Sequence, residues 1–145
     1  MYKVVLDPVV MLRGLLNPHS LCGPLFFDYA DRYRAVFSDE TVRATRVLLA
    51  HPIFLLAFPR LAKISPTRLS QVFLAAERVP IEPEPDVSVF VTTARVAQAD
   101  YLICEDKLLW LTQGSFGVPA IRCQAFLSLL DPDRFFSPAE ERIES

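Results

Sequence analysis

The feature that most restricts the fold is a short apolar run at residues 2–6 that stops abruptly. The run is rich in β-branched side chains and is followed by Asp7-Pro8, a pair that ends regular structure. A strand that is apolar without alternation is typical of a parallel sheet covered on both faces. The beginning of the chain therefore predicts a parallel α/β domain.

Similar runs recur along the chain and alternate with segments of helical character. We expect strands at residues 2–6, 33–37, 79–81, 100–104 and 118–122. The expected helices cover residues 9–16, 24–32, 39–50, 53–64, 66–77, 87–98, 107–111 and 124–130. Pro59 predicts a kink or a split into two short helices, Pro119 predicts an edge strand, and Ser38 is the expected N-cap of the third helix. This alternation favours an α/β fold with a mostly parallel sheet.

Length and composition limit the number of domains and the classes of function. A chain of 145 residues is too short for two independent cores, and 52% hydrophobic residues can fill one core. The 15 basic and 17 acidic residues give a net charge of −2, so any site for a polyanion has to be local. The composition changes near Asp131, and we expect one domain at residues 1–130 and a tail at 131–145.

The sequence lacks the signals of a membrane or secreted protein. No apolar run approaches the roughly 20 residues that span a bilayer, and Lys3 and Asp7 interrupt what would be the core of a signal peptide. Cys22, Cys104 and Cys123 lack the spacing of metal ligands. This pattern favours reduced thiols in a cytoplasmic protein over a disulfide framework or a zinc site.

Two acidic residues follow expected strands. Asp7 ends the first strand, and Asp106 comes shortly after the strand at residues 100–104. If these strands are neighbours, the carboxylates repel each other, and a divalent cation would relieve that repulsion. The alternative is that both acids cap helices or pair with basic side chains, because acids at strand ends are common caps.

Aromatic and basic clusters have both a functional and a structural interpretation. Aromatic residues that could stack on bases have the spacing of buried faces, which favours a core role; they are Phe26, Phe27, Tyr29, Tyr33 and Phe37. Four basic residues could form a local patch, but a solvated helix face is the more common outcome; they are Arg43, Arg46, Arg60 and Lys63.

Three segments resemble the PIN domain family, in particular the bacterial VapC-like toxins of toxin–antitoxin pairs. Lys3-Val4-Val5-Leu6-Asp7 with Leu15-Leu16-Asn17-Pro18 is similar to the opening segment of the family. Ala99-Asp100-Tyr101-Leu102-Ile103-Cys104-Glu105-Asp106-Lys107, the most specific match, is similar to A-D-Y-L-V-T-G-D-K. Residues 118–127 are similar to the closing strand and its helix.

The resemblance implies both an architecture and an activity. The family has a three-layer α/β/α sandwich and cleaves single-stranded RNA with Mg²⁺ or Mn²⁺. Asp7 and Asp106 match two of its acids and become the expected catalytic and metal-binding residues. An antitoxin protein is the partner that the resemblance implies, and we also expect the chain to form a homodimer.

Other acidic positions of the family are not acidic here. Ala44 stands where the family has a glutamate, and Val87 or Ser88 stands where it has its third acid. Pro8-Val9 replaces the family's Thr-Asn pair. With these acids missing, we expect at most one weakly bound ion. The nearby acids that could substitute are Glu40, Glu84, Asp86 and Glu105.

Two functions other than a nuclease follow from the same residues. A PIN-like domain that has lost catalysis could serve as a module that binds RNA or protein. Phe135 and Phe136 in the tail could instead dock on a partner, because two adjacent phenylalanines are costly to expose. Otherwise these side chains fold back on their own core.

Overall fold

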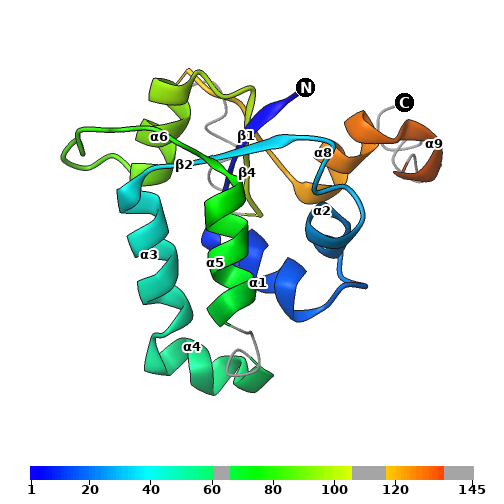
Figure 1. Cartoon of the computed structure of the whole chain (residues 1–145), viewed down its shortest axis with the longest axis horizontal. Coiled ribbons are helices and arrows are strands. Elements are labelled where there is room, and N and C mark those ends of the chain that lie inside the picture. The colour runs from blue at the N-terminus through cyan, green and yellow to red at the C-terminus, as the bar shows by residue number, and fades with distance from the viewer. Residues whose placement is uncertain (61–65, 106–116, 136–145) are drawn as a thin grey trace.

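The computed structural model describes residues 1–60, 66–105 and 117–135. Within these ranges five parallel strands form one sheet in the order β3-β2-β1-β4-β5 (Figure 1). The strands are β1 (Lys3–Leu6), β2 (Arg34–Phe37), β3 (Glu77–Arg78), β4 (Tyr101–Ile103) and β5 (Ala120–Ile121). β5 lies at the edge of this sheet, as Pro119 predicts.

The helices alternate with the strands along the chain. They are α1 (Pro8–Leu16), α2 (Gly23–Phe27), α3 (Asp39–Leu49), α4 (Pro52–Ala57), α5 (Pro66–Ala75), α6 (Val89–Ala97), α8 (Cys123–Leu130) and α9 (Pro132–Phe135). The expected helix at 107–111 lies outside the described residues. The α/β class and the parallel sheet are confirmed.

The strands send alternate side chains to two hydrophobic cores. Val4 and Leu6 pack with residues of α1, α2, α5 and α8, whereas Val5 packs with residues of α6. The same alternation divides Phe37 from Val36 in β2. Because successive side chains of a strand point to opposite faces, the sheet is covered on both sides. The three-layer α/β/α arrangement is confirmed.

Polar side chains cap the starts of α1, α3 and α6. Asp7 caps α1, and Ser38 caps α3 in a reciprocal capping box with Thr41. Ser88 caps α6, and Gln98 ends that helix in the left-handed conformation. Each cap satisfies backbone N–H groups that the first helical turn leaves without partners.

The strand expected at residues 79–81 is wrong. The third strand is β3, two residues earlier, and it pairs with β2 as soon as α5 ends. In the last hydrogen bond of this pairing, the Val79 N–H donates to the Phe37 carbonyl at 2.9 Å. Pro80 has no N–H to donate, so the ladder cannot continue.

The second expected helix is shorter than predicted, and the helix expected at residues 53–64 is interrupted as predicted. α2 ends at Phe27, and a tight turn follows in which the Tyr29 N–H donates to the carbonyl of Pro24. α4 ends before Pro59, which agrees with the expected interruption there. Pro59 prevents a regular continuation of α4 because it lacks the N–H donor that the helix requires.

The first residues of the expected tail form α9 and pack against the domain. The rings of Phe135 and Tyr29 meet edge to face, 5.5 Å apart. The Tyr29 hydroxyl donates to Asp131 at 2.8 Å. Phe135 therefore folds back on its own chain, while Phe136 lies outside the described residues.

Candidate active site

The sheet reverses its strand order between β1 and β4. From β1 the chain adds β2 and then β3 on one side, and it later adds β4 and β5 on the other. At such a switch point the loops leave the carboxyl ends of two adjacent strands in opposite directions, which opens a crevice for ligands. Any site of this fold is therefore expected at the ends of β1 and β4.

Asp7 lies directly at this point. It follows β1, and its backbone N–H donates to the Ile103 carbonyl of β4 at 3.0 Å. Its half-buried carboxylate accepts a hydrogen bond from the Val9 N–H through Oδ2, at 3.0 Å. The capping role that the sequence left open is thus real, and it coexists with a position at the switch point.

The strands that precede the two expected acids are neighbours. Leu6 pairs with Ile103 in the register of β1 and β4. Asp106 itself lies outside the described residues. The condition for bringing the two carboxylates together, adjacent parallel strands, is met.

Glu105 is the described acid that follows β4. Its Oε1 accepts a hydrogen bond from the Cys123 N–H at the start of α8, at 3.0 Å. The same oxygen lies 3.9 Å from Sγ of Cys22. This carboxylate is thereby held between α2 and the first turn of α8.

The other substitute acids lie elsewhere. Glu84 forms an exposed ion pair with Arg95 at 3.0 Å, and Asp86 lies in the same exposed loop with a φ of 62°. Glu40 lies in the first turn of α3. Among the described residues, one group of three His, Cys, Asp or Glu side chains is close enough to hold a metal ion. It consists of Cys22, Glu105 and Cys123, and includes neither Asp7 nor the other three acids.

Hydroxyl side chains connect the end of β2 to α6. Ser38, at the end of β2, is joined to Thr93 of α6 by a hydrogen bond of 2.8 Å between their hydroxyl oxygens. Ser88 caps α6 through the Phe90 N–H. Thr92 is buried, and its hydroxyl has no hydrogen-bond partner within the described ranges. This cluster was missed from sequence, although paired threonines inside an apolar helix are a visible signal.

The aromatic residues of the sequence pattern mainly form core. Tyr29, Tyr33 and Phe37 are buried, and Phe26 is half-buried. Phe27 is exposed, and the Arg68 guanidinium lies over its ring. The core interpretation is confirmed for the buried rings.

The four basic residues that could form a local patch are only partly described. Arg43 and Arg60 are exposed. The Arg46 guanidinium lies 5.2 Å from the Phe73 ring centre, and Lys63 lies outside the described residues. Arg46 therefore packs on an aromatic ring while it remains exposed, as a side chain on a solvated helix face can do.

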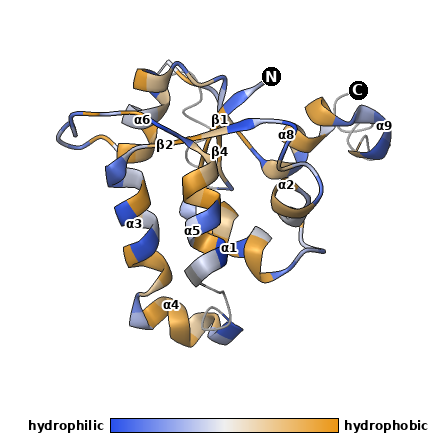
Figure 2. Cartoon of the chain, viewed as in Figure 1, coloured by the Kyte–Doolittle hydropathy of each residue, from blue (hydrophilic) through white to orange (hydrophobic). Residues whose placement is uncertain are grey.

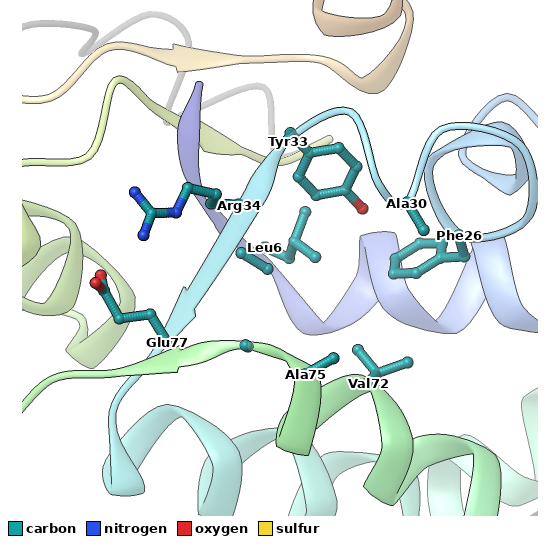
Figure 3. A pocket seen from close by; sticks show the side chains of 10 residues that line it. Leu6, Phe26, Ala30, Tyr33, Arg34, Val72, Ala75 and Glu77 are labelled. Carbon is teal, nitrogen blue, oxygen red and sulfur yellow. The ribbon is translucent and has the colours of Figure 1, made fainter. Parts of the chain in front are cut away.

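A cavity of about 410 Å³ lies beside the sheet, and none of the predicted site acids lines it. Its walls come from α2, β2 and α5, with Leu6 at the base (Figure 3). Arg34 and Glu77 stand at one end, and Phe26 and Tyr33 stand at the other. Asp7 is not among the lining residues, although its neighbour Leu6 is.

Comparison with known proteins identifies the architecture. No protein-family model matches the sequence, and no curated protein sequence matches it. A solved structure does match: a PilT N-terminus domain protein from the archaeon Sulfolobus solfataricus P2, with a TM-score of 0.51. The match covers 89% of this chain and 93% of that one, at 16% sequence identity. The fold is PIN-like. At this identity the similarity concerns the PIN-like fold alone.

In residues 1–60, 66–105 and 117–135, no helix is both long and apolar enough to cross a bilayer.

Proposed function

We propose that this protein is a metal-dependent endoribonuclease that cuts single-stranded RNA at the switch point of its PIN-like sheet. The observation that carries the proposal is the position of Asp7, at the carboxyl end of β1 and beside β4. Parallel α/β sheets bind their ligands at this location. The chain continues from β4 through Glu105 to Asp106, the second acid of the proposed site.

The donors in this region fit one hard divalent cation. Mg²⁺ is commonly held by one or two protein carboxylates, with waters and substrate phosphates as its remaining ligands. Asp7 and Asp106 would hold the ion, and the hydrogen bond from Val9 N–H orients the Asp7 carboxylate. When bound, such an ion neutralises phosphate charge and activates water.

The test is Mn²⁺-dependent cleavage of a labelled single-stranded RNA by wild type and Asp7→Asn. Asparagine caps a helix as well as aspartate, so this variant keeps the fold but loses the charge that holds a cation. We expect cleavage to fall at least 100-fold. Asp100→Asn is the matched control, because Asp100 bonds the Lys3 N–H at the start of β1, the opposite end of the strand.

Equal cleavage by wild type and Asp7→Asn would refute the proposed site. Equal loss in Asp100→Asn and Asp7→Asn would show that the effect is not local to Asp7. Cleavage that persists in excess chelator would rule out the metal dependence.

A PIN-like module that binds RNA or protein without cutting is the second candidate. It is supported by Ala44 and Ser88, which stand where the resemblance to the PIN family implies acids. This candidate predicts that the protein retains RNA or a protein partner while chelator and Mn²⁺ leave both binding and melting temperature unchanged.

We further propose homodimerisation through the arm formed by α3, α4 and α5, with an antitoxin protein as the regulatory partner. No residue of α4 is buried, although Figure 2 shows that the helix is largely hydrophobic. Four apolar side chains on the arm are strongly exposed, which is costly in water. They are Val47, Ile53, Leu56 and Leu74.

Leu56→Glu tests this interface. Leu56 is 82% exposed, so the substitution should leave the monomer folded while it places a charge in the proposed contact. We expect wild type to have the mass of a dimer in light scattering and the variant that of a monomer. Glu82→Gln, in the exposed loop on another part of the surface, is the control. A monomeric wild type at high concentration would contradict the dimer.

A further inference from the structure

Two cysteines that are far apart in sequence meet in the core. Cys22 precedes α2, Cys123 begins α8, and they are 101 positions apart. Their sulfur atoms are 2.6 Å apart. This is well below the roughly 3.5–4.0 Å of ordinary contacts between heavy atoms and approaches the S–S bond length of about 2.05 Å.

The backbone holds this contact from both sides. Gly23 follows Cys22, and a Cβ at this glycine would come within 2.2 Å of the Pro18 carbonyl oxygen. The Gly23 N–H also donates to Ser20 Oγ at 3.1 Å. On the other side, the Cys123 N–H donates to Glu105. The two sulfurs are therefore positioned by a tight turn and a bonded helix start, and α2 and α8 pack together (Figure 1).

We propose that Cys22 and Cys123 are a site of reversible oxidation and form a disulfide that links α2 to α8. The oxidant is a small-molecule disulfide such as oxidised glutathione. One cysteine sulfur attacks the oxidant and loses its proton, which releases one glutathione thiol. The second cysteine attacks the mixed disulfide, loses its proton and releases the other glutathione. Two cysteine thiols are oxidised, one Sγ–Sγ bond forms, and one glutathione disulfide is reduced to two thiols.

Geometry favours this modification over a metal at the same residues. A tetrahedral zinc ion with bonds of about 2.3 Å holds two thiolates about 3.8 Å apart, more than 1 Å farther than the observed contact. A closed zinc site also needs four ligands, whereas the described group offers three. The hydrogen bond with Cys22, together with burial, raises the pKa of Cys123. Because the thiolate is the reactive form, oxidation requires local opening of the contact between α2 and α8.

The test is an equilibrium titration of the full chain with graded ratios of oxidised to reduced glutathione. Urea below the unfolding transition allows the core to open. Alkylation after denaturation then counts the remaining thiols. We expect the count to fall from three to one, with Cys22 and Cys123 in one crosslinked peptide. Dithiothreitol should restore all three, and the oxidised form should melt on the order of 10 °C higher.

Cys104→Ala is the matched control, because Cys104 is as deeply buried as the pair. This variant should still lose two thiols, whereas Cys22→Ala should form no internal disulfide. Three thiols at every glutathione ratio, or a crosslink that includes Cys104, would overturn the proposal. Zinc binding with one-to-one stoichiometry that needs both Cys22 and Cys123 and prevents their oxidation would assign a metal site instead. None of these readouts depends on nuclease activity.

Discussion

Asp7 has a structural role that requires no ligand. Its carboxylate caps α1 through the Val9 N–H, and its backbone joins β1 to β4. Folding therefore favours an aspartate at this position independently of the proposed metal site. Loss of activity in an alanine variant would not distinguish the two roles.

Substitutions of Asp7 separate the cap from the charge. Asp7→Ala removes the acceptor for the Val9 N–H and should lower the free energy of unfolding by about 1 kcal/mol. Asp7→Asn keeps an acceptor oxygen and should lie within a few tenths of a kcal/mol of wild type. Urea unfolding without divalent cations measures both, and equal stabilities of the two variants would show that the cap contributes little.

At the scale of elements, α6 is attached to the sheet by hydroxyl groups. Thr93 bonds both the Ser38 hydroxyl and the Val89 carbonyl, at 2.8 and 2.7 Å. Thr92, one position earlier, is 3% exposed, and its hydroxyl is without a hydrogen-bond partner among the described residues. A buried hydroxyl that lost its water without a replacement partner is a net cost.

The two threonines of α6 should respond in opposite directions to valine, which has nearly the same shape. Thr92→Val removes the cost of a buried polar group and should raise the free energy of unfolding by about 1 kcal/mol. Thr93→Val removes two hydrogen bonds and should lower it by about 1–2 kcal/mol. Thermal and urea unfolding measure both; a clear loss of stability in Thr92→Val would mean that its hydroxyl is bonded.

At the scale of the whole molecule, two buried groups should make the folded protein less stable at high pH. Burial and the nearby Cys123 raise the pKa of the Tyr33 hydroxyl, which donates to the Leu25 carbonyl at 2.7 Å. The hydrogen bond with Cys22, together with burial, raises the pKa of Cys123. Both groups therefore keep their protons in the folded chain at a pH where the unfolded chain releases them.

The sign of this effect is a loss of stability with rising pH. The contribution is complete below the ordinary pKa values, about 8.5 for cysteine and 10 for tyrosine, and declines above them. Between pH 10 and 12 the free energy of unfolding should fall by as much as ~1.4 kcal/mol per pH unit for each group. Urea unfolding of wild type and Tyr33→Phe measures the slope. The variant should be less stable at pH 7, because the Leu25 carbonyl loses its donor, but should show a shallower decline; identical slopes would contradict the role of Tyr33.

Much of the order of elements could be predicted from local sequence. The apolar run before Asp7-Pro8 is β1, Ser38 caps α3, and Pro59 follows the end of α4. These outcomes depend on interactions within a few residues, such as capping, the missing proline N–H and the alternation of side chains. The prediction of the third strand failed because the position of that strand depends on its pairing with β2, which local propensity cannot reveal.

The candidate site was likewise predictable only in part from the sequence. Sequence marked Asp7 and Asp106 as strand-end acids and Glu105 as a neighbouring acid, because they follow apolar runs. Sequence alone could not show that Glu105 bonds the start of α8, or that Cys22 and Cys123 meet across 101 positions. It determined which segments become strands and helices and which acids follow them. Only the tertiary structure decided the neighbours of those acids and thiols, because contacts between distant residues depend on how the strands are ordered and which helices cover each face.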